Sequence, residues 1–166
     1  MNENKTQQDI LVQSKLLFAE RGFNKTTTAM IADAVGIKKP SLYYFFKNKE
    51  AIYITLLKDT VIEITSVFSN KKSNSLLWTI TEIFKVSKNS GAFIFSVQAL
   101  SESSMLEIMP MALNFEKKMT EYFKKQNIKC TIKEAIMLIV DTSQSYARHV
   151  AEKQKVTTPK KYAELI

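Results

Sequence analysis

Cysteine, glycine and proline are scarce in this sequence, and each scarcity excludes a class of protein. The 166 residues include a single cysteine, Cys130, so no intramolecular disulfide framework can form and a reducing cytoplasm is the expected compartment. Three glycines and three prolines are too few for an all-β fold built on many tight turns. These shortages favour a helical intracellular protein.

Long hydrophobic runs are missing as well. No stretch approaches the roughly 20 apolar residues that span a bilayer. The N-terminus is polar, and its first apolar run, residues 16–18, is too short for the core of a signal peptide. We therefore expect no membrane partner.

The residue patterns of enzymes and metal proteins are not found either. The single histidine, His149, and Cys130 lie far from each other in the sequence and form no nucleophile–base pair. No cluster has the spacing of metal ligands, and no glycine-rich loop suits a phosphate. We predict no enzymatic activity, no metal and no cofactor.

Positive charge and helical periodicity are what the sequence does have. Lys and Arg number 24 against 16 Asp and Glu, a formal net charge of +8. This balance favours an anionic partner such as nucleic acid, although lysine-rich chains also occur without one. Apolar residues recur with a period near 3.6 throughout, which predicts an all-α fold of about nine helices.

The expected helices cover most of the chain. A box of Thr6 and Asp9 opens the first, and two further capping boxes, Ser104–Glu107 and Thr131–Glu134, mark later starts. Pro110 must kink or divide its helix. The predicted ranges are residues 6–21, 28–35, 39–46, 48–68, 74–88, 93–100, 104–127, 131–153 and a short last helix after Pro159.

The most informative stretch runs from Gly36 to Lys49. Gly36 suits the end of a helix because it adopts positive φ without a steric penalty, and Pro40 suits the first turn of the next. Leu42 and Phe46, four residues apart, can be buried together. The opposite face then presents Lys39, Ser41, Tyr43 and Tyr44. Since no acid occurs in this stretch, that face suits a negatively charged groove.

A short preceding helix, which Thr27 and Thr28 can cap, completes a helix-turn-helix. Over roughly residues 6–54 the sequence resembles the DNA-binding signature of the TetR (tetracycline-repressor) family. The resemblance rests on Arg21-Gly22-Phe23, Thr27-Thr28, Ile31-Ala32, Gly36-Ile37, Pro40-Ser41-Leu42-Tyr43, Phe46 and Lys49-Glu50. It implies a cytoplasmic homodimer that binds double-stranded operator DNA. Residues 1–48 would form the helix-turn-helix DNA-binding domain, and residues 49–166 the effector-binding and dimerisation domain.

The resemblance also implies DNA contacts, position by position. The phosphate-contacting threonine of the family corresponds to Thr28, whereas Ala29 stands where a contacting side chain is frequent. The first turn of the recognition helix would enter the major groove. The implied contact residues are Thr28, Lys38, Lys39, Pro40, Ser41, Tyr43, Tyr44 and Lys49. Tyr43 packing on the first helix, away from DNA, remains an alternative.

Residues 49–166 support weaker expectations. Methionine and aromatic side chains adapt to apolar ligands, although ordinary core packing explains most of them. The predicted effector residues are Trp78, Phe84, Phe93, Gln98, Met105, Met109, Phe115 and Tyr146. A row of small residues flanked by aliphatics predicts a two-fold interface, or else packing within one subunit. That row and its flanks are Ile136, Ile139, Val140, Ser143, Ala147, Val150 and Ala151.

Together with these patterns, the resemblance implies a transcriptional repressor that leaves its operator when a small, largely apolar effector binds. Two alternatives stay open: a helical protein-interaction module, and a constitutive DNA binder without a ligand. Members of the family usually continue further at the C-terminus. We therefore expect either a compact variant or an incomplete sequence, which leaves the dimer geometry open.

Overall fold

The computed structural model describes residues 3–90, 100–129, 131 and 133–134. Within these residues the chain is all-α, as predicted, with no strand. The helices are α1 (Glu3–Lys25), α2 (Thr28–Val35), α3 (Lys39–Phe45), α4 (Lys49–Phe68), α5 (Leu76–Ser90) and α6 (Glu102–Lys125), with a short 3-10 segment, η1 (Lys71–Asn74), between α4 and α5. None of the described helices is long and apolar enough to cross a membrane.

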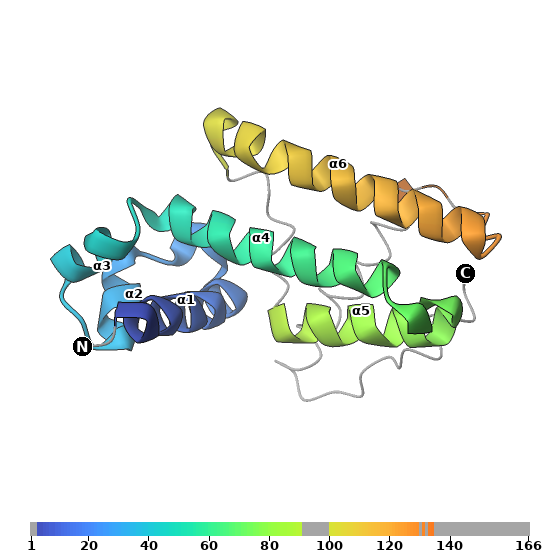
Figure 1. The fold of residues 1–166 in the computed structure, drawn as a ribbon. Coiled ribbons are helices and arrows are strands. Elements are labelled where there is room, and N and C mark those ends of the chain that lie inside the picture. The colour runs from blue at the N-terminus through green and yellow to red at the C-terminus, as the bar shows by residue number, and fades with distance from the viewer. Residues whose placement is uncertain (1–2, 91–99, 130, 132, 135–166) are drawn as a thin grey trace.

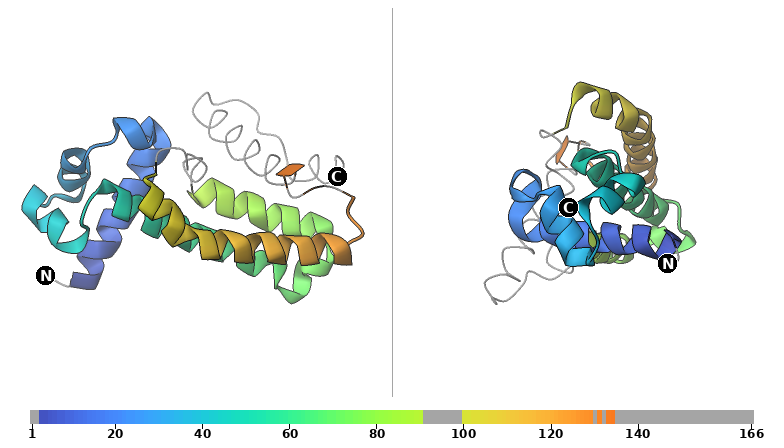
Figure 2. Two further views of the ribbon diagram at one scale, coloured as in Figure 1. Left: turned by 90° about the horizontal axis from the view of Figure 1, so that it is seen from above. Right: turned by 90° about the vertical axis from the view of Figure 1, so that its left-hand side faces the viewer.

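Helix α4 joins the two ends of the molecule (Figure 1). Its first turns follow α3 and lie against α1, and its later turns run between α5 and α6. Figure 2 also shows α1, α2 and α3 together at one end of the three long helices α4, α5 and α6. A change in the position of α4 would therefore be felt at both ends.

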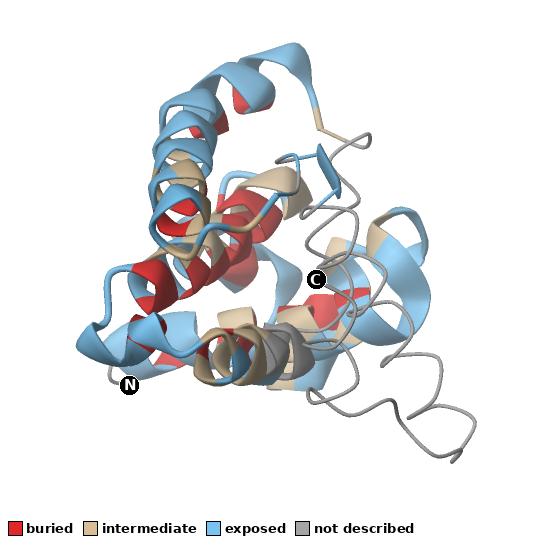
Figure 3. Cartoon of the chain, turned by 90° about the vertical axis from the view of Figure 1, so that its right-hand side faces the viewer, coloured by how far each residue is buried: buried red, intermediate tan, exposed pale blue. Residues whose placement is uncertain are grey.

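Two groups of buried side chains follow this division. The first fills the α1–α3 end and includes Ile10, Phe18, Leu42 and Tyr53, all less than 2% exposed. The second, around Met119, lies between α4, α5 and α6. Figure 3 shows the buried residues on the sides of these helices that face one another. The first group continues past residue 48 into α4 and α6, so the predicted division at residue 48 stays a prediction.

Local signals explain the ends of the N-terminal helices. Helical geometry is interrupted at Gly22, whose φ of 78° and ψ of 164° suit glycine almost alone. Gly36 ends α2 with φ 74° and ψ 31°, as expected. The predicted start of the first helix is wrong, since α1 begins at Glu3 and Thr6 is buried within it.

Helix α6 corrects one further expectation and decides part of another. Its N-cap is Ser101, whose hydroxyl accepts the Ser104 N–H at 3.4 Å, so the helix begins before the predicted Ser104 cap. Pro110 lies inside the helix without dividing it. Residues on both sides of the proline, Ile108 and Met119, are buried, and this packing offsets the hydrogen bond that proline cannot donate.

The side chains of α4 follow its expected apolar periodicity with one exception. Ile52, Leu56 and Ile64 are buried, but Ile62 is 60% exposed. Ile62 lies two positions from Ile64, on a different side of the helix, so the two cannot share one buried face.

The C-terminal capping box is confirmed where it is described. The Glu134 N–H donates to Thr131 Oγ1 at 3.2 Å, and the Thr131 N–H donates to Glu134 Oε2 at 2.7 Å. The remainder of the predicted 131–153 helix, the last predicted helix and most of the 93–100 helix lie outside the described residues.

Candidate nucleic-acid interface

A three-residue connection joins α2 to α3. Thr27 caps α2, its hydroxyl accepting the Met30 N–H at 3.2 Å. Gly36 donates its N–H to the carbonyls that end α2, and Ile37 donates to the Ala32 carbonyl at 3.0 Å. These backbone bonds turn the chain sharply, so that α3 starts at Lys39 with its first turn facing solvent.

The predicted amphipathic split of α3 is confirmed. Leu42 is fully buried and Phe46, at the C-cap, is 6% exposed. The opposite face is open: Tyr43 is 44% and Tyr44 is 72% exposed. Lys39, Pro40 and Ser41 of the first turn are exposed as well. Two rings and a cationic first turn therefore project from one side of a firmly anchored helix.

The lysines of this surface keep their charge unneutralised by the rest of the described chain. Lys38, Lys39 and Lys47 are exposed, and no described carboxylate forms an ion pair with any of them. The ammonium of Lys39 lies 5.9 Å from the centre of the Tyr43 ring. Such a surface attracts a polyanion at long range.

Two of the predicted contact residues meet across the two helices. The hydroxyls of Thr28, at the start of α2, and Tyr43, on α3, are 3.3 Å apart. Tyr43 thus presents its hydroxyl to α2 while almost half of the side chain remains exposed. A second tyrosine contact is looser: the Tyr44 hydroxyl donates to Glu3 Oε1 at 3.4 Å.

Lys49 has a structural contact that the sequence did not reveal. Its ammonium donates to the carbonyl of Phe23 at 2.6 Å and to that of Thr26 at 2.8 Å, and it lies 4.1 Å from the centre of the Phe23 ring. Burial lowers the pKa of Lys49 below its ordinary value. Lys49 therefore ties the α1–α2 connection to the first turn of α4. One signal for this contact was present in the sequence: the carbonyls at the end of a helix that stops at glycine lack partners within the helix and require a donor from elsewhere.

A second unforeseen contact joins α4 to α6. Glu50 Oε1 accepts the backbone N–H of Ser101 at 2.6 Å, and two turns later Lys58 pairs with Glu107. The Ser101 N–H, followed by the hydroxyls of Ser101 and Ser104, holds the pKa of Glu50 below its usual range. A polar cavity of about 450 Å³ lies beside these contacts. The start of α6 is thus attached next to the helix-turn-helix.

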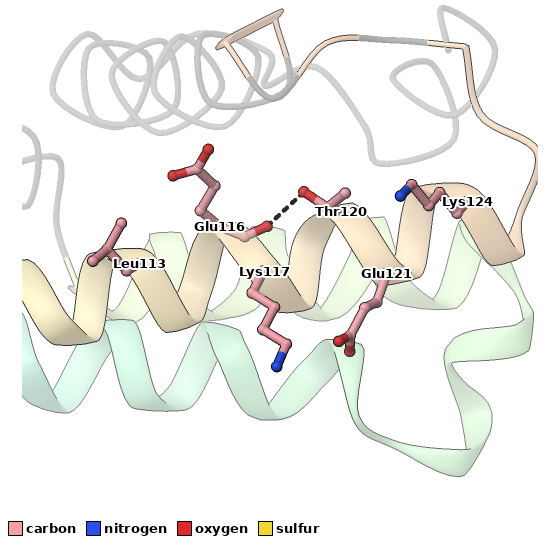
Figure 4. Close-up of a pocket in the computed structure, with 6 residues that line it drawn as sticks. All are labelled: Leu113, Glu116, Lys117, Thr120, Glu121 and Lys124. Atoms are coloured by element: carbon pink, nitrogen blue, oxygen red, sulfur yellow. Dashed lines mark hydrogen bonds between the residues drawn. The ribbon is translucent and has the colours of Figure 1, made fainter.

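The predicted effector residues are not brought together around a cavity by the described chain. Trp78 is half-buried, Phe115 packs 6.0 Å from Phe68, and Met105 and Met109 are 40% and 48% exposed. A cavity of about 490 Å³ is lined by one face of α6 and contains none of them (Figure 4). Phe93, Gln98, Tyr146 and the side chain of Phe84 lie outside the described residues, as do Ile136, Ile139, Val140, Ser143, Ala147, Val150 and Ala151. Both sets stay predictions.

Comparison with known sequences places a family domain over the helix-turn-helix. Residues 10–56 match the family of bacterial regulatory proteins described as tetR. A stretch of 63 residues is 41% identical to the biofilm operon icaADBC HTH-type negative transcriptional regulator IcaR of Staphylococcus aureus strain Newman. The match covers 36% of this chain and 34% of the relative. The chain therefore spans about a third of the length of the curated relatives it matches.

Solved structures extend the likeness to the fold of most of the chain. A regulatory protein in the tetR family from Rhodococcus RHA1 has a TM-score of 0.72 at 18% identity, over 97% of this chain and 94% of that one. The regulator FadR from Bacillus subtilis, solved in complex with stearoyl-CoA, has a TM-score of 0.64 at 23% identity, over 95% and 96%. At these identities the likeness concerns the fold alone.

Proposed function

We propose that this chain belongs to the TetR family of bacterial regulatory proteins and that it binds operator DNA as a transcriptional repressor. The observation that carries the proposal is the exposed face of α3. Its first turn presents Lys39 and Ser41 to solvent, the Tyr43 hydroxyl lies beside that of Thr28, and no described carboxylate forms an ion pair with its lysines. The family is one of transcriptional regulators, and we expect no enzymatic activity.

In this proposal α2 contacts the DNA backbone and α3 contacts the bases. The N-terminus of α2, with its free N–H groups and the hydroxyl of Thr28, suits a phosphate. The first turn of α3 would enter the major groove, where Lys39 can donate to guanine and Pro40 can touch a thymine methyl. Tyr43 would reach a phosphate from the same side. In a homodimer, two such surfaces must lie about 34–36 Å apart to enter successive major grooves.

Release from DNA by a small, largely apolar effector is the second part of the proposal. Support comes from the relative solved with stearoyl-CoA and from the methionine and aromatic content of the body. Helix α4 offers the connection, because Lys49 holds its first turn to the helix-turn-helix while its last turns pack in the body. A ligand that favours one position of α4 would change the spacing of the two recognition helices.

The alternatives predict different behaviour. A constitutive DNA binder would bind an operator without responding to any ligand. A helical interaction module would bind DNA weakly, without sequence preference. If an effector weakens DNA binding, then DNA must weaken effector binding by the same factor, because the coupling is reciprocal.

Selection of bound duplexes from a random pool, followed by gel-shift titration against salt, tests the DNA-binding proposal. The affinity for the selected duplex should fall as a power of the salt concentration. Lys39→Ala should relax the preference at one base position by about 1–3 kcal/mol. Lys72→Ala, at the distant η1, is the matched control and should bind as the unaltered protein does. If no sequence is enriched, the proposal is wrong.

A further inference from the structure

The first half of α6 exposes apolar side chains on the side turned away from the molecule. Leu106 is 62%, Leu113 60%, Met109 48% and Met105 40% exposed. The opposite side of the same half carries Ile108, which is buried. A helix that is apolar on both sides is normally covered on both sides.

The exposed residues form an ordered stripe with a charge at each end. Leu106, Met109 and Leu113 are spaced by three and four residues, so they share one face. Continuing by one turn in each direction, the stripe reaches Glu102 before them and Lys117 after them, both exposed. Neither charge forms an ion pair with another described residue. The α6 stripe, as these five residues are named below, therefore runs from acid through apolar to base.

Such an order is complementary to itself when reversed. In an antiparallel pair of α6 helices centred between Met109 and Pro110, Leu106 faces Leu113 of the second copy. At the same register Glu102 faces the second copy's Lys117, and Lys117 faces its Glu102. All the contacts thus occur twice, as a two-fold axis requires. A parallel pair would instead place like charges together at both ends.

We propose that the α6 stripe is a self-association surface on which a second copy of this chain packs antiparallel. The occupant is a second copy because the charge order fits its own reverse. The surface differs from the residue 136–151 face predicted above, and it requires no DNA binding. Its apolar part spans about two helical turns, far less than the ~800 Å² per partner of a standard interface. It would therefore be a weaker contact, with a dissociation constant of roughly 10–100 µM.

Charge-reversal variants distinguish this antiparallel pairing from non-specific hydrophobic association. Glu102→Lys or Lys117→Glu alone places like charges together at both ends of the pair, and each should weaken association about tenfold. The double variant restores opposite charges at both ends and should return to within about threefold of the unaltered chain. Within one chain the two residues are about 22 Å apart along the helix, so direct pairing inside a subunit cannot produce that recovery.

Sedimentation equilibrium of the full chain, from about 1 to 300 µM, measures the weakest association step. Met109→Glu, next to the two-fold axis, should abolish this step, and Lys125→Glu, a charge reversal off the stripe, should leave it unchanged. Helicity and thermal unfolding verify that each variant folds. Loss of a dimer, or of a tetramer where another face already forms a dimer, supports the proposal. A double variant no better than its singles, an unchanged Met109→Glu variant, or no association of the unaltered chain would overturn it.

Discussion

Glu50 and Ser101 are joined by a hydrogen bond of 2.6 Å across 51 residues of sequence, from the first turn of α4 to the N-cap of α6. The recognition helix, α3, ends at Phe45, shortly before Glu50 in the sequence. The same stretch of α4 is held from the other side by Lys49, whose ammonium binds the Phe23 and Thr26 carbonyls. The helix-turn-helix and the body are therefore attached to one turn of one helix.

Removing the Glu50 carboxylate should loosen α6 from α4. Glu50→Ala leaves the Ser101 N–H without this acceptor, and because the site is half-exposed we expect a loss of about 1 kcal/mol in unfolding free energy. Urea unfolding measures it. Ser101→Ala removes only the capping hydroxyl, whereas Ser101→Pro also removes the N–H, and the φ of −66° at this residue is one that proline adopts. If Ser101→Pro and Ser101→Ala are equally stable, the bond contributes nothing.

The same bond should give the stability a defined pH dependence. The pKa of Glu50 is lowered in the fold, so its contribution is present above the ordinary value of 4.5 and is lost as the pH falls through the lowered value. The difference in unfolding free energy between the unaltered chain and Glu50→Ala should stay constant from pH 7 to about pH 5 and then shrink. Taking this difference removes the similar contribution of Glu134, whose pKa is also lowered. A difference that grows on acidification would contradict the assignment.

Lys49 should act both on stability and on DNA binding. Lys49→Met keeps the aliphatic stem near Phe23 but leaves two carbonyls without their donor, and we expect a loss of about 1–2 kcal/mol. DNA binding should weaken for all sequences, with a salt slope smaller by about one. Lys47→Met, at an exposed lysine, is the control and should change stability by less than about 0.5 kcal/mol. An unchanged salt slope for Lys49→Met would assign Lys49 a positioning role only.

Among the described residues, Gly22 and Gly36 have positive φ, and substituting them should destabilise the fold to different degrees. Neither has a heavy atom within 4 Å of an added Cβ, so the cost of substitution is conformational. At Gly36, in the left-handed helical region, alanine should cost about 1 kcal/mol and asparagine less. At Gly22, with ψ near 164°, alanine should cost up to about 3 kcal/mol. Urea unfolding of the three variants tests this order, and equal losses for both alanines would contradict it.

Local signals were sufficient for much of the N-terminal fold. Gly36, Pro40 and the Leu42–Phe46 spacing predicted both the turn and the buried face of α3. Glycine tolerates the positive φ that ends α2, proline fixes φ in the first turn of α3, and helical periodicity decides which side chains share a face. The Asn48 cap of α4 is local in the same way: its side chain accepts the Ala51 N–H at 2.8 Å, three residues away.

Contacts between distant residues were beyond such reasoning. The sequence predicted Lys49 as a DNA contact. Its ammonium meets two backbone carbonyls only because the α1–α2 connection lies beside the first turn of α4. Whether Pro110 divides its helix likewise depends on which neighbours pack against α6 on either side of it.

The sequence by itself determined the turn between α2 and α3, the buried side of α3 and its cationic, acid-free face, because each depends on interactions within a few residues of chain. The tertiary structure alone decided that Glu50 meets Ser101, that Thr28 meets Tyr43 and that the α6 stripe is left exposed. Those outcomes depend on how whole helices pack, and a local pattern does not specify which of several apolar faces another helix will cover.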